Sequence, residues 1–302
     1  MVDVSDWFIG DLQPYSEGAR DKALLYKPSV PPFDFLLPNH RYLLKKTYQE
    51  KSGTILYEQY WNEIIAYHLG RLLNIAVPPA FVAHNGDYYG VLIEWFYGYQ
   101  GEDLSRRGGE VIVNYIDNYD TTKGGKHNWQ AIETIFETEK VENWLHEWVQ
   151  ILCFDAIIGN TDRHQDNWQI VDYLASGKRS LSPAFDNGTS LGYNIRADHI
   201  PNWLNKLPKM VKNGYHHMKW QESDEKQANH FELLEKIVGK HPNVLDIVKE
   251  IAALDISPLQ KQIVQLTEFE LKDPAYQLSN VRADFIWQLL SFRMNHLKEL
   301  FT

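Results

Sequence analysis

The most constraining feature of the sequence is the spacing of three polar residues. Asp162 and Asn167 lie five positions apart, directly after an apolar helical stretch, and Asp186 follows nineteen positions after Asn167. An Asp and an Asn in one loop commonly serve turns or helix caps, so that pair alone carries little information. The strand-like runs 168–173 and 180–185 flank a turn and set Asp186 beyond a short hairpin, which makes the pattern informative.

These three residue types fit the chemistry of phosphoryl transfer. Their spacing matches the pattern of protein kinases. Asp162 would orient an attacking hydroxyl and accept its proton. The side-chain oxygens of Asn167 and Asp186 would bind Mg²⁺ against the phosphates of ATP. His164 follows Asp162 closely, and we expect it to stabilise this catalytic loop through hydrogen bonds rather than to act as the base.

A lysine for the α- and β-phosphates and a glutamate that pairs with it are expected upstream. The run RYLLKK (41–46) predicts a strand, and if Leu43 faces the core, alternation sets Lys45 on the same face and Lys46 on the other. We therefore favour Lys45, with a solvated strand end as the alternative. Glu63 lies near the packed face of the following helix, where a carboxylate usually has a partner. Lys45 is the natural candidate, and a surface ion pair is the other interpretation.

The order of the predicted elements favours an α+β, bilobal, protein-kinase-like fold. Residues 1–95 are predicted to form a small mixed α/β N-lobe, and residues 96–302 a mostly helical C-lobe. The Gly-rich, polar stretch 98–129 is interpreted as a long loop with one short helix. The last strand of the small lobe ends in a hinge whose backbone is expected to bind adenine. This hinge comprises Glu94, Trp95 and Phe96.

With these residues in place, the chain resembles the HipA-like serine/threonine kinases. Three stretches carry the resemblance: SEGARDKALL (16–25), YLLK followed by YWNEIIAYHLGRLLNIAVPPA, and FDAIIGNTDRHQDNWQIV with LSPAFDNGTSLG. The resemblance implies a phosphate loop and, in some members, a serine in it that is autophosphorylated, for which Ser16 is the one serine nearby. The residues implied for the phosphate loop are Gly18, Ala19, Arg20 and Lys22.

The same resemblance implies what the protein works with. Its cofactors would be ATP and Mg²⁺, its acceptor a serine of a protein substrate, and its partner a small helix-turn-helix antitoxin. The chain looks like the short form of the family that lacks an extra N-terminal subdomain. However, the loop Asp-Arg-His-x-x-Asn at 162–167 is also similar to that of phosphoinositide kinases. A lipid or small-molecule kinase and a nucleotide-binding pseudokinase therefore remain alternatives.

Composition excludes several other classes of protein. The formal net charge is -10, which argues against direct nucleic-acid binding through a basic field. No stretch is long and apolar enough to span a membrane, and the N-terminus has no signal-peptide pattern, so we expect a cytoplasmic protein. The single cysteine, Cys153, rules out a multi-cysteine zinc site and is expected to be buried. The pair His216-His217 is expected at a surface turn.

Overall fold

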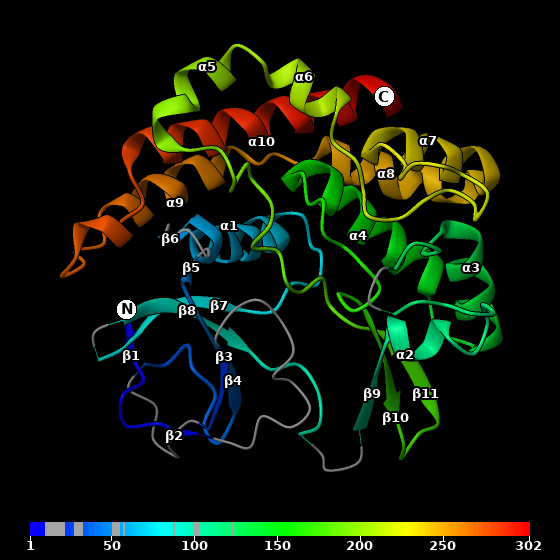
Figure 1. Cartoon of the computed structure of the whole chain (residues 1–302), viewed down its shortest axis with the longest axis horizontal. Helices are drawn as coiled ribbons and strands as arrows, with labels where there is room; N and C mark the ends of the chain where they lie inside the picture. The colour runs from blue at the N-terminus through cyan, green and yellow to red at the C-terminus, as the bar shows by residue number, and fades with distance from the viewer. Residues whose placement is uncertain are drawn as a thin grey trace.

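The structure is a computed structural model that describes residues 1–9, 22–26, 33–49, 55–56, 58–86, 88–99, 103–121 and 124–302. In Figure 1 a twisted sheet with one helix against it forms the lower left of the molecule. A layered group of helices occupies the top and the right, and a small three-stranded sheet hangs below them. Figure 1 therefore shows a sheet-based part and a helix-based part.

The main sheet has six strands, in the spatial order β1, β7, β8, β4, β3 and β2. The parallel pair is β1 with β7, and the other neighbours are antiparallel. The strands are β1 (Val2–Asp3), β2 (Phe8–Ile9), β3 (Lys22–Tyr26), β4 (Arg41–Lys46), β7 (Ala80–Asn85) and β8 (Tyr88–Glu94); a separate pair comprises β5 (Tyr48–Gln49) and β6 (Ile55–Leu56). The strand predicted at 41–46 is β4, whereas the two-residue strands β1 and β2 were missed because they are too short to show alternation.

Successive side chains of β4 point to opposite sides of the sheet, and this determines which of them face helix α1. Tyr42 and Leu44 are buried in a cluster on one side of the sheet. Leu43 and Lys45 point to the opposite side, because successive residues of a strand face opposite ways. On that side Leu43 packs against the larger core that contains helix α1. The predicted assignment of Lys45 to the same face as Leu43 is therefore confirmed.

Helix α1 (Glu58–Leu72) packs on β7 and β8. Its apolar residues recur at three- and four-residue intervals, and Trp61, Ile65 and Leu69 have no exposed surface. The helix cannot extend far past its last turn, because Pro78 and Pro79 follow. One face of α1 therefore covers the sheet.

The stretch predicted as a long loop contains a strand. Residues 103–107 form β9 (Asp103–Arg107), followed by α2 (Gly108–Ile112). The strand β9 pairs with β10 (Gln169–Tyr173), which pairs with β11 (Lys178–Leu181). The prediction was wrong because β9 is polar and its partner lies far along the chain. The cross-strand ion pair between Arg106 Nε and Asp172 Oδ2, at 2.8 Å, stabilises the pairing and has no local sequence signal.

Helix α4 is the centre of the helical part. Its residues from Trp148 to Ile158 are almost all buried, as expected for a helix that is apolar on every side, and the predicted burial of Cys153 is confirmed. It contacts α7, α8 and α10. The helices of this part are α3 (Trp129–Thr138), α4 (Trp144–Ile158), α5 (Ile200–Leu204), α6 (Leu207–Lys212), α7 (His230–Lys240), α8 (Leu245–Ala253), α9 (Ser257–Thr267) and α10 (Asn280–Phe301).

Helix α4 ends directly before the loop that the sequence predicted to be catalytic. Gly159 ends the helix in the left-handed conformation, with φ of 66°, which suits glycine. Residues 160–167 then run between the helices and the main sheet. Among the residues that the structure describes, no helix combines the length and the apolar character needed to cross a bilayer.

Candidate active site

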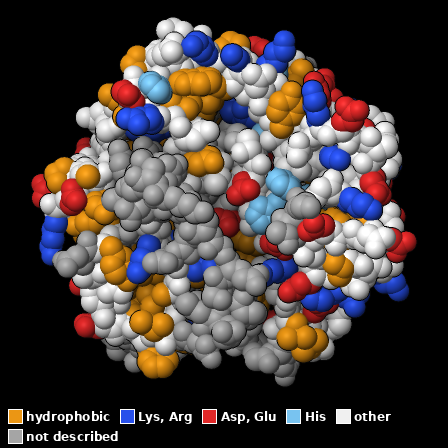
Figure 2. All heavy atoms as spheres, in the orientation of Figure 1, with side chains coloured by type: hydrophobic (Ala, Val, Ile, Leu, Met, Phe, Trp, Pro, Cys, Tyr) orange, Lys and Arg blue, Asp and Glu red, His pale blue; other side chains and the backbone are white. Residues whose placement is uncertain are grey.

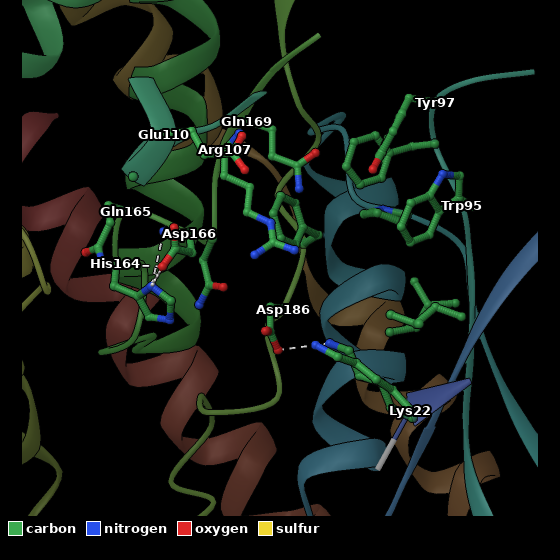
Figure 3. A pocket seen from close by; sticks show the side chains of 18 of the residues that line it. Lys22, Trp95, Tyr97, Arg107, Glu110, His164, Gln165, Asp166, Gln169 and Asp186 are labelled. Carbon is green, nitrogen blue, oxygen red and sulfur yellow. Dashed lines mark hydrogen bonds and ion pairs between the residues drawn. The ribbon is translucent and has the colours of Figure 1, made fainter. Parts of the chain in front are cut away.

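A cleft of about 830 Å³ separates the main sheet from the helical part, and it contains most of the predicted site residues. In Figure 3, Lys22 and Asp186 point toward one another across this cleft, while His164 and Asp166 lie together on its far side. The predicted residues that line it are Lys22, Lys45, Glu94, Trp95, Phe96, His164, Asn167 and Asp186. Of the implied phosphate loop, Gly18, Ala19 and Arg20, like Ser16, lie outside the described residues.

Lys45 connects the two sides of the cleft. Its Nζ lies 2.8 Å from Glu63 Oε1 and 2.9 Å from Asp186 Oδ1, and only 7% of the residue is exposed. Lys46 points to the other side of the strand, where its ammonium lies 4.3 Å from the centre of the Tyr88 ring. The two adjacent lysines therefore have different environments, and Lys45 faces one carboxylate from each part.

Helix α1 also binds the segment that contains Asp186. The second oxygen of Glu63 accepts the backbone N–H of Asn187 at 3.0 Å. The amide of Asn62 donates to the carbonyls of Gly188, at 3.2 Å, and Ser190, at 2.7 Å. Two neighbouring helix residues thus hold the backbone on the C-terminal side of Asp186.

The backbone at Asp186 adopts an uncommon conformation. Its φ is 57°, in the left-handed region, which Asp and Asn tolerate better than other residues with a Cβ. Such positions persist where surrounding contacts fix them, and they concentrate at functional sites. Here the contacts from α1 provide that restraint, and they direct the Asp186 carboxylate into the cleft.

Hydrogen bonds within the loop determine the position of Asp162. Its backbone N–H donates to Asn160 Oδ1 at 3.0 Å, and its carbonyl accepts the amide of Asn167 at 2.7 Å. The hydroxyl of Thr189 lies 3.4 Å from Asp162 Oδ2. Burial raises the pKa of Asp162, and the nearby Asp186 carboxylate adds to this rise. A carboxylate with a raised pKa is a better proton acceptor than an ordinary aspartate.

The donor set of the cleft fits a magnesium ion. Because the Asn167 amide nitrogen donates to Asp162, its amide oxygen points away from that carbonyl and can serve as a ligand. The Asp186 side chain is 36% exposed and contacts Lys45 through one oxygen. Carboxylate and amide oxygens are the ligands that Mg²⁺ prefers, with water and phosphate completing its shell. His164 accepts the N–H of Asp166 through Nδ1 at 3.1 Å, a structural contact within the loop.

A buried ion pair that the sequence did not reveal supports both loops. Arg163 has no exposed surface and binds Asp155 through Nη2 at 2.8 Å. The same guanidinium donates to the carbonyls of Asn167, at 3.1 Å, and Phe185, and to Asn187 Oδ1 at 2.8 Å. Burial alone would raise the pKa of Asp155, but the charge of Arg163 lowers it far below its usual value.

The pair His216-His217 is not a surface turn, so that prediction was wrong. His216 is 1% exposed, and its Nε2 lies 3.4 Å from Asp155 Oδ2. His217 lines the cleft, with its ring centre 5.7 Å from that of His164. Burial lowers the pKa of His217 to about 4. The turn-like sequence gave no indication that His216 is buried beside Asp155 or that His217 lines the cleft.

One end of the cleft is apolar and suits a flat base. Leu43 and Ile93 come from the sheet, and Phe185 from the helical part, with Phe96 5.5 Å from Phe185 between ring centres. At the predicted hinge, the N–H of Trp95 donates to Arg41 at 3.0 Å. The carbonyl of Trp95 accepts the Tyr99 hydroxyl at 2.5 Å. The main chain of Trp95 is thus engaged, and the N–H of Glu94 donates to the carbonyl of Pro79 at 2.8 Å, so a base would meet the carbonyl of Glu94 or the main chain of Phe96.

The far wall of the cleft comes from β9 and α2, which the sequence analysis had interpreted as loop. Arg107, Gly109 and Glu110 line it. A Cβ at Gly109 would come within 2.6 Å of Asp166 Oδ1, so the helix approaches the catalytic loop at a residue without a side chain. The pair Gly108-Gly109 was the available signal, because glycine often marks a close backbone approach.

Comparisons with known proteins agree with this geometry. A family model described as the HipA-like C-terminal domain matches residues 15–256. No curated protein sequence matches the chain. The solved structure of the proinflammatory kinase CtkA of Helicobacter pylori superposes with a TM-score of 0.73 at 16% identity, covering 99% of this chain and 97% of that one. HipA of Shewanella oneidensis, solved with HipB and its operator DNA, gives 0.50 at 13% identity, covering 94% of this chain and 66% of that one. The predicted α+β bilobal kinase-like fold is confirmed by the likeness to CtkA.

Proposed function

The chain belongs to the HipA-like C-terminal domain family, and from this premise we propose that it is an ATP- and Mg²⁺-dependent protein serine/threonine kinase. The observation that supports this best is the contact of Lys45 with both Glu63 and Asp186. A buried lysine between two carboxylates at a cleft mouth is typical of a phosphate-binding site in kinases.

The side chains divide the reaction between them. Lys45 and Lys22 would bind phosphate oxygens of ATP, and Asn167 and Asp186 would hold Mg²⁺, which when bound neutralises phosphate charge. Asp162 would orient the acceptor hydroxyl and take its proton. Asp162 is partly buried, and its partial removal from water would strengthen these electrostatic interactions. The division of the lobes at residue 95 stays part of the proposal.

Labelled ATP and a cell lysate test the reaction class. We expect label from the γ-phosphate on protein serine with the wild type, and none with Asp162→Asn. Label that partitions into an organic solvent instead would indicate a lipid kinase. Nucleotide binding without any turnover would indicate a pseudokinase. Both of those outcomes contradict the proposal, and a thermal melt of the variant checks that it is folded.

We further propose that the kinase is the toxin of a toxin–antitoxin module in the cytoplasm. The support is its family and its likeness to HipA, which was solved with HipB and operator DNA. A small helix-turn-helix protein encoded next to this chain would be the partner. Co-expression should restore growth that the wild-type kinase arrests, whereas Asp162→Asn should not arrest growth at all. Arrest by the inactive variant would contradict the toxin mechanism.

A further inference from the structure

A second cavity, of about 440 Å³, lies beside the loop that carries Asp162 and shares no lining residue with the nucleotide cleft. Thr161 and Thr189 line it. Thr161 precedes Asp162 in the chain, and the hydroxyl of Thr189 lies 3.4 Å from Asp162 Oδ2. Asn167, which lines the nucleotide cleft, donates to the carbonyl of the same aspartate. Asp162 therefore contacts the wall of each cavity, which is the position required of a residue that joins a phosphate donor to an acceptor.

The charge of this cavity is opposite to that of the protein. The chain carries a formal net charge of -10. Among the residues that line the cavity in the described part of the chain there is no Asp or Glu, whereas His199, Lys209 and Arg293 are present. Figure 2 shows Lys and Arg side chains along the upper edge of the molecule, over the α5–α6 segment that contributes to this wall. A local basic cavity in an acidic protein favours an anionic ligand.

Arg293 is the most informative residue of the cavity. It is 2% exposed, and its Nε donates to the carbonyl of Ala156 at 2.5 Å. Its Nη2 lies 3.3 Å from His230 Nδ1. Within the described part of the chain, no carboxylate lies within ion-pair distance of this guanidinium, and Nη1 has no hydrogen-bond acceptor. A buried charge usually has a partner, so the arginine has unused binding capacity.

A purely structural role accounts for only part of these contacts. Ala156 lies in the last turn of α4, where a cation stabilises the helix dipole. That role uses Nε and leaves the other end of the guanidinium, Nη1, beside two glycines. A Cβ at Gly159 would approach Arg293 Cζ to 3.3 Å, and one at Gly214 would approach Nη1 to 3.2 Å. The absence of side chains at both positions keeps the guanidinium open toward the cavity.

We propose that this cavity binds the protein segment that is phosphorylated, and that Arg293 and Lys209 recognise an acidic side chain beside its serine or threonine. This inference rests on the proposed kinase function and adds a substrate class to it. In the reaction, the acceptor oxygen forms a bond to the γ-phosphorus of ATP as the bond to the leaving ADP breaks, and the hydroxyl proton passes to Asp162. The acceptor therefore needs both a hydroxyl at Asp162 and a carboxylate at the basic wall.

Synthetic serine peptides test the preference. Each carries one Glu at a different position flanking the serine, and a matched set carries Gln in its place. We expect at least one Glu peptide to show a KM about tenfold lower than its Gln counterpart, the size of a charge-assisted contact. Equal kinetics for every pair would overturn the substrate class while leaving the kinase proposal intact. Peptide-independent ATP hydrolysis, measured alongside, reports separately on that proposal.

Charge-reversal variants then locate the preference. Lys209→Glu should raise the KM of the preferred Glu peptide about tenfold and leave the KM for ATP unchanged. The matched control is Lys212→Glu, because Lys212 is exposed on the same helix but does not line the cavity. Arg293→Gln should remove the discrimination between Glu and Gln peptides, and circular dichroism verifies its fold. If Lys209→Glu and Lys212→Glu have the same effect, the cavity is not the acceptor site.

Discussion

Lys45 Nζ and Glu63 Oε1 are 2.8 Å apart, with the two side chains 9% and 4% exposed. A strand and a helix of the same lobe thus share a buried ion pair that opens onto the cleft. Removing one member of such a pair leaves the other charge buried without compensation, which is more damaging than losing the attraction itself. This asymmetry makes the pair a sensitive test of the site.

Lys45→Met should impair both activity and stability. The loss of a phosphate-binding charge should lower kcat/KM for ATP about a hundredfold or more. Exposing Glu63 and Asp186 to each other should reduce the free energy of unfolding by about 3 kcal/mol. Lys46→Met is the matched control, since Lys46 lies on the opposite face, and it should change stability by no more than about 1 kcal/mol, the size of its contact with the Tyr88 ring. Equal effects of the two variants in kinetics and urea unfolding would rule out the assigned role of Lys45.

Asp162→Asn should act on turnover rather than on nucleotide binding. The amide cannot accept the hydroxyl proton, so we expect kcat to fall by about 10²–10⁴-fold. The dissociation constant for ATP, measured by calorimetry, should change by less than about threefold, because Asp162 does not line the nucleotide cleft. Retention of wild-type kcat would exclude Asp162 as the proton acceptor.

Asp186→Asn should raise the concentration of Mg²⁺ needed for activity. Asparagine tolerates the left-handed backbone at this position, so the fold should survive while one charged ligand is lost. Asp186→Val should in addition lower the melting temperature, because a β-branched residue with φ of 57° is strained. An unchanged Mg²⁺ titration for Asp186→Asn would place the metal elsewhere.

Arg163→Met should destabilise the protein, although Arg163 does not line the nucleotide cleft. The variant leaves Asp155 buried without its partner, and we expect a loss of about 3–5 kcal/mol in unfolding free energy. Arg106→Gln removes partly exposed ion pairs with Asp172 and Glu139 and should lower the free energy of unfolding by only about 1–2 kcal/mol. Chemical denaturation of both variants measures the difference. Similar losses of unfolding free energy in the two variants would show that the pair of Arg163 and Asp155 does not stabilise the two loops of the site.

Stability should fall as the pH drops below about 6.5, the usual pKa of histidine. The Nε2 of His127 accepts the indole N–H of Trp168 at 3.3 Å, and burial lowers the pKa of His127 well below that value. Below that pH the unfolded chain binds a proton at His127 that the folded chain does not bind. One such histidine lowers the free energy of unfolding by about 1.4 kcal/mol for each pH unit. His127→Leu should flatten this slope in urea unfolding at pH 7.5 and 5.5. An unchanged slope would mean that His127 is protonated in the fold.

Local patterns of the sequence predicted the elements whose partners are near in the chain. The run 41–46 predicted β4, and α1 has regular apolar spacing. Alternation was also enough to distinguish Lys45 from Lys46. The strand β9 was missed because it is polar and its register depends on β10, a long-range pairing that no local window contains.

The sequence predicted the candidate site residues that belong to a spaced motif. It did not predict the residues whose contacts depend on burial in the fold. Spacing in the chain marked Asp162, Asn167 and Asp186, and the structure brings their loops together. Nothing in the sequence shows that Arg163 would be fully buried with Asp155, since an arginine in a polar loop is usually solvated. The pair forms because the loop after α4 turns back and brings Arg163 to Asp155 of that helix.

Asn62 and Glu63 are neighbours on one turn of α1, and between them they bind Lys45 and the main chain of Asn187, Gly188 and Ser190. These bonds all depend on the same stretch of backbone. A small rotation of α1 would therefore break them together rather than one at a time. The position of the Lys45 ammonium and that of the Asp186 segment are therefore coupled through two adjacent residues of one helix, so displacing that turn would disturb both at once.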